Sequence, residues 1–148
     1  MAKGLTNDYL ENITFKFIGS SFLGVYPCDA HPKIPKKNFS IIFNTGKKDS
    51  DGEHFIAISV SNKKAFYFDP FGERPANADI IKFLSSLERT FTWNKIKIQH
   101  EVSSFCGFYC LAYLVSLKRR ISFSRFKNLF SIQNLKQNDK KVIEFLTK

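Results

Sequence analysis

The sequence is poor in cysteine, in long apolar runs and in linker-like segments, and each absence excludes a class of protein. Three cysteines, an odd number, disfavour a secreted disulfide scaffold and favour a reducing intracellular setting. Met1–Asp8 has no apolar signal core, and no apolar run is long enough to span a bilayer, which indicates a soluble chain. No repeat, low-complexity block or Pro/Gly-rich linker divides the sequence, so we expect one domain over residues 1–148.

Acidic residues are the minority, and the basic excess is unevenly distributed. Asp and Glu number 13 against 23 Lys and Arg, which leaves a net charge of +10. Residues 118–148 hold nine Lys or Arg against two acidic residues and so account for +7 of it. A basic face indicates polyanion binding, with DNA as the expected partner and an affinity that depends on salt. Charge alone is equally consistent with basic side chains that only solvate helices.

Apolar and aromatic residues, by contrast, are abundant. The chain is 43% hydrophobic and contains seventeen phenylalanines, so a packed globule is expected rather than a disordered chain. Hydrophobic periodicity predicts strands at 38–44, 54–61, 64–69 and 93–99, and helices at 7–14, 77–87, 106–118, 122–130 and 138–148. The glycines of 17–26 indicate a loop that leads into a further extended segment. The predicted fold class is therefore α+β, with a small mixed central sheet flanked by helices.

Four residues of the kinds that thiol hydrolysis requires follow one another along the chain. They are His54, Asp69, Gln99 and Cys106. A cysteine is a useful nucleophile only as its thiolate, and an imidazole oriented by a carboxylate is the usual group that takes the proton. A glutamine adds a neutral donor for the oxyanion that forms when the thiolate attacks a carbonyl. Each residue alone is ordinary, and the ordered set predicts the site.

Cys106 is expected at the N-terminus of a buried helix, where unpaired backbone amides and the helix dipole favour an anion. Gly107 beside it leaves room for a substrate carbonyl to approach those amides. The alternative is a buried structural cysteine, which is the commoner role of a lone cysteine on an apolar helix. That alternative fits Cys110 better, so we assign Cys110 to the core and Cys28 to a loop.

His54 opens a predicted strand after the polar loop 47–53, and Asp69 ends the neighbouring hairpin strand. The two residues are therefore expected to be cross-strand neighbours, with the carboxylate reaching the second imidazole nitrogen. The alternatives are a surface histidine and an aspartate that only forms a turn with Pro70 and Gly72. The two roles of the aspartate are compatible with each other.

Gln99 is predicted to close the strand before the Cys106 loop, where its amide and the Cys106 backbone amide would donate to an oxyanion. The plainer alternative is a solvent-exposed strand end. A metal site is a further alternative, with candidate ligands Cys106, Cys110, His100 and His54. Paired Cys-x-x-Cys spacing is absent, so we expect no metal.

Five segments resemble the adenovirus-type processing protease (adenain-like), a cysteine protease related to the enzymes that deconjugate ubiquitin-like modifiers. They are Phe22-Leu23-Gly24-Val25-Tyr26, Ile42-Phe43-Asn44-Thr45, Gly52-Glu53-His54-Phe55, Tyr67-Phe68-Asp69-Pro70-Phe71-Gly72 and Gln99-x6-Cys106-Gly107-x2-Cys110. The resemblance runs from about residue 17 to residue 117 and implies the cysteine-protease fold of that family.

The same resemblance implies a role for seven residues. They are His54 as general base, Asp69 as its orienting carboxylate, Cys106 as nucleophile, Gln99 as oxyanion donor, and Gly24, Phe55 and Gly107 as substrate contacts. Papain-like enzymes carry the cysteine before the histidine, so the chain order separates the two families.

The sequence departs from the family pattern at several points. Phe55 stands where a Trp often follows the histidine. Asp69 stands where the adenovirus enzyme has Glu and the deconjugating relatives have Asp. No cysteine lies between Cys28 and Cys106, which argues against a disulfide-tethered peptide activator, and the chain is shorter beyond its nucleophile helix.

The function implied by the resemblance is a viral cysteine endopeptidase that cleaves precursor structural proteins during virion maturation, after small, Gly-containing motifs. The chemistry requires no cofactor, DNA or a peptide is the implied activator, and a monomer acting in the virion and the host nucleus is expected. One alternative is a deconjugating protease that acts on a ubiquitin-like modifier. Another, from a different class, is a non-catalytic nucleic-acid-binding module whose thiol is structural.

Overall fold

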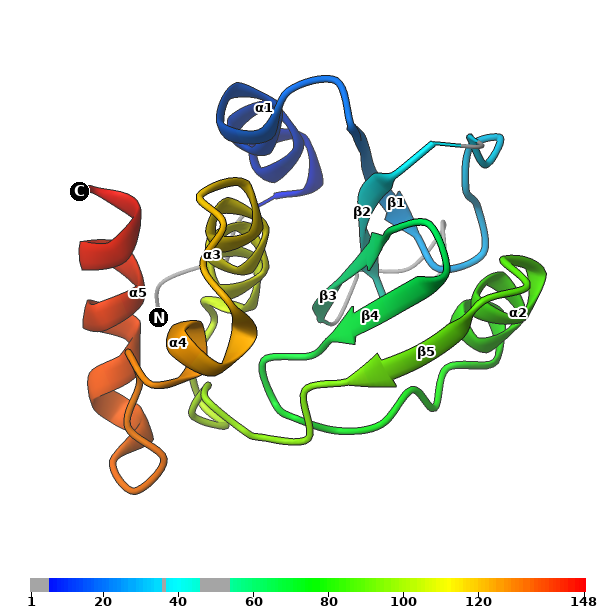
Figure 1. The fold of residues 1–148 in the computed structure, drawn as a ribbon. Coiled ribbons are helices and arrows are strands. Elements are labelled where there is room, and N and C mark those ends of the chain that lie inside the picture. The colour runs from blue at the N-terminus through cyan, green and yellow to red at the C-terminus, as the bar shows by residue number, and fades with distance from the viewer. Residues whose placement is uncertain (1–5, 36, 46–53) are drawn as a thin grey trace.

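The computed structural model describes residues 6–35, 37–45 and 54–148, which are arranged around a five-stranded sheet (Figure 1). The strands are β1 (Phe22–Pro27), β2 (Phe39–Asn44), β3 (Phe55–Val60), β4 (Lys64–Phe68) and β5 (Thr90–Trp93). The helices are α1 (Asn7–Ile18), α2 (Ala78–Ser86), α3 (Cys106–Lys118), α4 (Phe123–Lys127), the short 3-10 helix η1 (Leu135–Gln137) and α5 (Asn138–Leu146). The predicted polar loop 47–53, which includes Gly52 and Glu53, lies outside the described residues.

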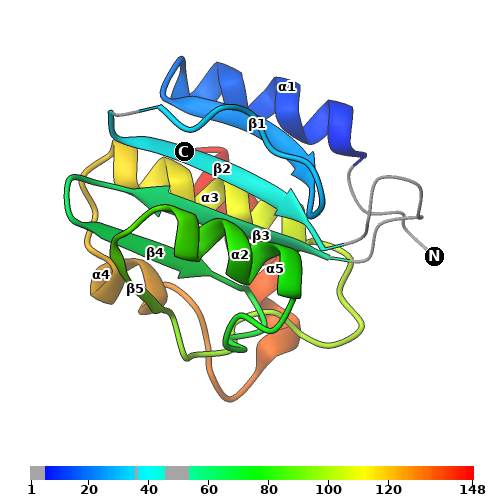
Figure 2. The same cartoon turned by 90° about the vertical axis from the view of Figure 1, so that its right-hand side faces the viewer.

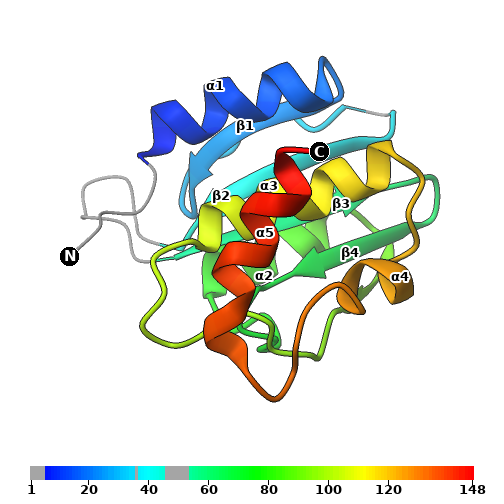
Figure 3. The ribbon, with the colours of Figure 1, turned by 90° about the vertical axis from the view of Figure 1, so that its left-hand side faces the viewer.

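The sheet is mixed and has helices on both faces. Its strand order is β1-β2-β3-β4-β5, with antiparallel pairing from β2 to β4 and a parallel strand at each edge. Helix α2 covers one face (Figure 2), and α3 covers the other, with α5 packed on the outer side of α3 (Figure 3). Helix α1 lies along β1. The predicted α+β class, with a small mixed sheet flanked by helices, is confirmed.

Strand β3 is apolar on both faces, and a separate hydrophobic cluster forms on each side of it. Ala57 packs in the cluster beneath α3, whereas Ile56 and Ile58 pack in the cluster beneath α2. All three are fully buried, and burying a large aliphatic side chain contributes about 1.5–3 kcal/mol. Core packing on both faces therefore fixes the strand that begins directly after His54.

Helix α3 is buried around most of its circumference because it lies between the sheet and α5. Its Tyr113 stacks on Phe68 of β4 with ring centroids 4.7 Å apart, and the Tyr113 hydroxyl shares a hydrogen bond of 2.8 Å with Ser59. Phe126 of α4 packs edge-on against both rings. These contacts hold the helix that begins at Cys106 against the two strands next to His54 and Asp69.

The strand predicted at 93–99 is wrong. The parallel partner of β4 is β5, Thr90–Trp93, and the chain beyond it is irregular up to α3. Lys95 has a φ of 58°, in the left-handed region, and this turn ends the strand. The alternation of isoleucine and lysine that predicted a strand comes instead from a loop whose isoleucines face the core. Ile98 is buried in the core, and Ile96 packs partly buried against it.

Other elements agree with the predicted ones apart from their ends. Helix α1 runs on to Ile18, where Gly19 with a φ of 89° caps it, and the extended segment expected next is β1. Asn77 caps α2 as predicted, since its side chain accepts from the N–H groups of Asp79 and Ile80. Within the part of the chain that the structure describes, no helix is long and apolar enough to cross a membrane.

Candidate active site

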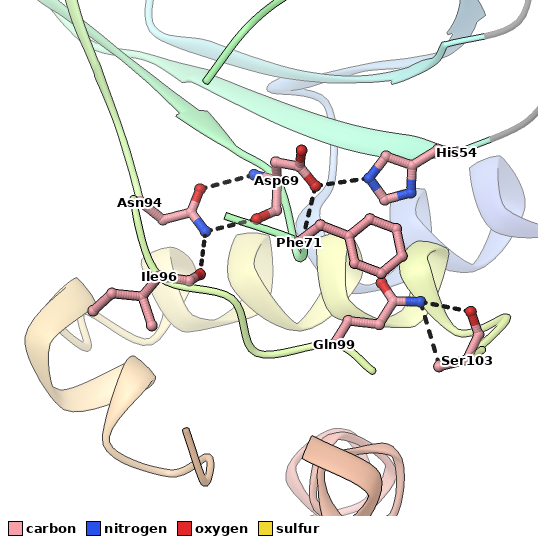
Figure 4. A network of polar contacts seen from close by, with 7 residues as sticks. All are labelled: His54, Asp69, Phe71, Asn94, Ile96, Gln99 and Ser103. Atoms are coloured by element: carbon pink, nitrogen blue, oxygen red, sulfur yellow. Dashed lines mark hydrogen bonds and ion pairs between the residues drawn. The ribbon is translucent and has the colours of Figure 1, made fainter. Parts of the chain in front are cut away.

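His54 and Asp69 meet at one end of the sheet, where β3 begins and β4 ends. The Nε2 atom of His54 lies 2.7 Å from Oδ1 of Asp69 (Figure 4). Their side chains are 16% and 8% exposed, so the pair is largely shielded from water. The hairpin thus brings together the imidazole and the carboxylate that the sequence analysis paired.

The turn after β4 fixes the Asp69 carboxylate. The N–H of Phe71 donates to the same Oδ1 at 2.8 Å, and the N–H of Gly72 donates to the Asp69 carbonyl at 2.7 Å. Gly72 has a φ of 74°, and a Cβ there would lie 2.5 Å from the Ile96 backbone, so the turn requires glycine. The Phe71 ring stacks on His54 with centroids 4.6 Å apart. Asp69 therefore forms the turn and contacts the imidazole at the same time.

Cys106 completes this group. It is the first residue of α3, where the free N–H groups of the first turn favour an anion, and its side chain lies close enough to His54 to raise the pKa of that imidazole. Three of the four predicted catalytic residues thus lie together, with Asp69 and Cys106 both acting on His54.

The surroundings of His54 favour its charged form. Burial lowers the pKa of His54, but hydrogen bonds to Asp69 and Cys106, together with the negative charges of those groups, outweigh burial. The pKa is raised from its ordinary 6.5 to about 9. An imidazole that stays protonated at neutral pH, next to a cysteine, is what an imidazolium–thiolate pair requires.

The raised pKa predicts how stability depends on pH. Protonated His54 stabilises the folded chain, so its contribution is complete below pH 6.5 and is lost as the pH rises through about 9. The loss is on the order of 3 kcal/mol. Urea unfolding should show a difference in unfolding free energy between the wild type and His54→Gln. We expect this difference to shrink between roughly pH 6 and pH 10, a range that spans the unfolded and folded pKa values of His54. A difference that does not change with pH would contradict the protonated pair.

Gln99 differs from its prediction in its place in the fold. It lies in the irregular segment before α3 rather than at a strand end, and it is fully buried, which contradicts the alternative of a solvent-exposed residue. Its Nε2 donates to the Ser103 carbonyl at 3.0 Å and to Ser103 Oγ at 3.3 Å (Figure 4). Among the described residues its Oε1 has no hydrogen-bond partner. Its neighbours Ile98 and Ser103 make hydrogen bonds to Asn138 and Asp139 at the start of α5, a tertiary contact that the sequence pattern did not reveal.

Helix α5 holds the segment between Gln99 and Cys106. Ser103 Oγ and the Tyr109 hydroxyl both donate to Oδ1 of Asp139, each at 2.8 Å. Burial raises the pKa of Tyr109, and the Asp139 carboxylate raises it further, so this hydroxyl remains a donor. The acidic first turn of α5 therefore fixes the approach to α3.

The three predicted substrate contacts occupy different environments. Gly107 is buried in the first turn of α3, next to Cys106. Phe55 is 6% exposed and belongs to the core cluster beneath α3. Gly24, with a φ of 135°, faces Glu11 of α1, whose carboxylate would lie 2.5 Å from an added Cβ. Substrate binding stays a prediction for all three, and the contacts shown for Phe55 and Gly24 are packing contacts.

The other two thiols are buried. Cys110 is fully buried, and burial raises its pKa well above the ordinary value, as do the nearby Cys106 and Asp69. Cys28, assigned to a loop, is also buried, and it packs in the cluster beneath α2. Within residues 6–35, 37–45 and 54–148, no group of three His, Cys, Asp or Glu side chains is placed to hold a metal ion.

Four residues that support the predicted set received no role from the sequence, three of them by direct contact and Asp139 through Ser103. They are Phe71, Asn94, Ser103 and Asp139. The sequence could have identified Phe71, because it lies two residues after Asp69 in the same turn. The other three belong to segments whose position relative to the site is set only by tertiary packing.

Comparison with known proteins identifies the family. A family model described as adenovirus endoprotease matches residues 22–148. No curated protein sequence gives a match. The crystal structure of the ASFV pS273R protease superposes with a TM-score of 0.62 at 19% identity, over 84% of this chain and 61% of that chain. A second structure of it, with selenomethionine, gives 0.55 at 21% identity, over 76% and 43%.

A structure of AvrA with IP6 and CoA gives a TM-score of 0.50 at 18% identity, over 94% of this chain and 54% of that chain. This chain therefore spans less than two thirds of the length of these three solved chains, and at these identities the likeness concerns the fold. The family model, in contrast, covers most of the sequence, including His54, Asp69, Gln99 and Cys106. The chain belongs to the adenovirus endoprotease family of cysteine peptidases.

Proposed function

We propose that this chain is a cysteine endopeptidase in which Cys106 is the nucleophile and His54 the general base. The observation that carries the proposal is the His54–Asp69 hydrogen bond next to Cys106 at the first turn of α3, where the thiol acts on the same imidazole. Such a group supplies a nucleophile, a residue that carries the proton and a carboxylate that orients that residue.

The reaction follows from these positions. The Cys106 sulfur attacks the carbonyl carbon of the scissile peptide bond, and the C=O electron pair moves to the oxygen. As the tetrahedral intermediate collapses, the C–N bond breaks and His54 gives its proton to the leaving amine. His54 then takes a proton from water, whose oxygen attacks the thioester and releases the acid and the thiolate. Asp69 holds the Nε2 side of the ring throughout.

We assign the oxyanion to the Gln99 side chain and the Cys106 backbone N–H. In the structure the Gln99 amide donates to Ser103, so its donation to an oxyanion requires the release of one of these bonds. Removing one oxyanion donor typically lowers kcat by about 10²–10³-fold. The proposed role of Gln99 is therefore realised only when substrate is bound.

The proposed substrates are precursors of viral structural proteins, cut after small, Gly-containing motifs during virion maturation. The family of the chain and its fold likeness to the ASFV protease support this assignment. It implies a monomer that acts in the virion and the host nucleus and needs no cofactor for the chemistry.

DNA is the proposed activator, with a peptide as the alternative. Support comes from the charge of residues 118–148, since Arg119, Arg120, Arg125 and Lys136 are all exposed. Counterion release makes such binding weaken steeply with salt. Affinity for DNA that is absent or independent of salt would contradict the assignment.

The test is cleavage of a peptide library by the purified full chain, with and without duplex DNA. We expect cleavage after Gly-containing motifs, a higher rate with DNA at low salt, and loss of that increase at high salt. A folded ubiquitin-like protein with a C-terminal extension is assayed beside the library. If only the folded substrate is cut, the enzyme is a deconjugating protease. If neither substrate is cut with DNA or with a peptide activator present, the chain is not the proposed endopeptidase.

A further inference from the structure

We propose that Asn94 is a positioning residue for the catalytic group: its buried side-chain amide holds the backbone of Asp69 and so aims the carboxylate at His54. The inference rests on the proposed function for its kinetic consequence, although its structural consequence can be measured without any substrate.

The contacts between the two residues are reciprocal. Oδ1 of Asn94 accepts from the Asp69 N–H at 2.9 Å, and Nδ2 of Asn94 donates to the Asp69 carbonyl at 2.6 Å (Figure 4). Nδ2 also donates to the Ile96 carbonyl at 2.9 Å. Asn94 is 5% exposed, so these bonds are made away from water, where an unpaired amide would cost about 1–3 kcal/mol.

Sheet geometry explains why a side chain is needed at this position. The parallel ladder between β4 and β5 reaches Tyr67 and Trp93, and directly afterwards the left-handed φ of Lys95 turns the second strand away. The backbone groups of Asp69 would then lack a partner strand. The Asn94 amide, which carries the same donor and acceptor as a peptide group, takes the place of the missing strand.

Asn94 acts on the imidazole of His54 through Asp69, whose backbone it fixes. A carboxylate on a short side chain can be aimed only as well as its Cα is fixed, and Asp69 Oδ1 must accept from His54 and Phe71 together. Movement of the Asp69 backbone would lengthen the bond to His54, which is one of the interactions that raise the pKa of that imidazole. The titration of His54 therefore responds to the position of Asp69, alongside the contributions of burial and Cys106.

The experiment compares Asn94→Leu with Asn138→Leu in the full chain. Asn138 is a matched control because it is also buried and also makes three hydrogen bonds to backbone groups, at the start of α5, with none to Asp69. The readout is the pKa of His54 from an NMR titration of its ring protons, measured together with urea unfolding. Asn94→Ser, which is smaller and keeps a hydroxyl, is measured in the same way and replaces the leucine variant if that variant does not fold.

We expect the pKa of His54 to fall by about 1 or more in the Asn94 variants and to stay at its wild-type value in Asn138→Leu. In cleavage assays the Asn94 variants should lose about 10–10²-fold in kcat with KM changed less than about threefold. An unchanged His54 pKa in a folded Asn94 variant, or an equal fall in the Asn138 control, overturns the proposal. A wild type with the raised His54 pKa that cuts no peptide would instead contradict the proposed function, and the titrations would still decide the role of Asn94.

Discussion

Replacing Cys106 with alanine is expected to lower kcat/KM for peptide cleavage by about 10⁴-fold or more, because the variant has no atom that can form the acyl-enzyme. Cys106 is only partly buried at the start of α3, so the substitution should leave the fold intact. The measurement is the initial rate with a fluorogenic peptide selected from the library, with circular dichroism and urea unfolding as checks of structure.

Cys110→Ala is the control for this prediction. Cys110 lies one turn further along α3, is fully buried, and has a pKa that burial raises well above the ordinary value, so it supplies no thiolate at neutral pH. We expect it to lose about 1 kcal/mol of stability and to retain cleavage within a few-fold. If the Cys110 variant lost activity while the Cys106 variant cleaved at the parental rate, the assignment of the nucleophile would be wrong.

Two replacements of Asp69 are expected to separate its two effects on His54, the hydrogen bond that orients the imidazole and the negative charge of the carboxylate. In Asp69→Ala the imidazole and the Phe71 N–H both lose their acceptor, and kcat should fall by about 10³–10⁴-fold. In Asp69→Asn an amide oxygen can still accept both bonds, because both end on Oδ1, but the negative charge is lost. We therefore expect Asp69→Asn to fall between the wild type and Asp69→Ala.

The pKa of His54 provides the second measurement. Both substitutions remove the carboxylate charge, so the pKa should fall from about 9 in each, and further in the alanine variant, which also lacks the hydrogen bond. NMR titration of the ring protons and the pH dependence of kcat/KM should shift together. Equal kinetic losses in the two variants would show that charge, rather than orientation, accounts for the whole contribution of Asp69.

The sequence was sufficient for the parts of the site that local pattern encodes. A mostly apolar segment that begins at Cys106 and ends in basic residues predicted α3 with the same bounds, 106–118. Two apolar runs joined by a short polar turn predicted the β3–β4 hairpin, and the hairpin alone implies that His54 and Asp69 lie close together. Periodicity and turn chemistry are properties of a few consecutive residues, so no tertiary information was needed.

Gln99 shows where this reasoning stops. Ile96 and Ile98 alternate with lysines as they would in a strand, and the prediction placed Gln99 at the end of that strand. In the structure the N–H groups of Ile98 and Gln99 both bond the Pro70 carbonyl, and Asn138 of α5 donates to the Ile98 carbonyl. A loop that is hydrogen-bonded to Pro70 on one side and to Asn138 on the other buries alternate residues as a strand does. Only the hydrogen-bond partners distinguish such a loop from a strand.

By itself, then, the sequence determined which reactive groups the chain carries, their order and the elements that present them, because residue chemistry and hydrophobic period are local. Tertiary structure alone decided what holds those groups in place. Asn94 reaches Asp69 across 25 residues and Asp139 reaches Ser103 across 36, with buried hydrogen bonds whose partners no local pattern specifies. A buried polar group must find a partner wherever the fold supplies one, so these contacts follow from the packing of β5 and α5 against the site.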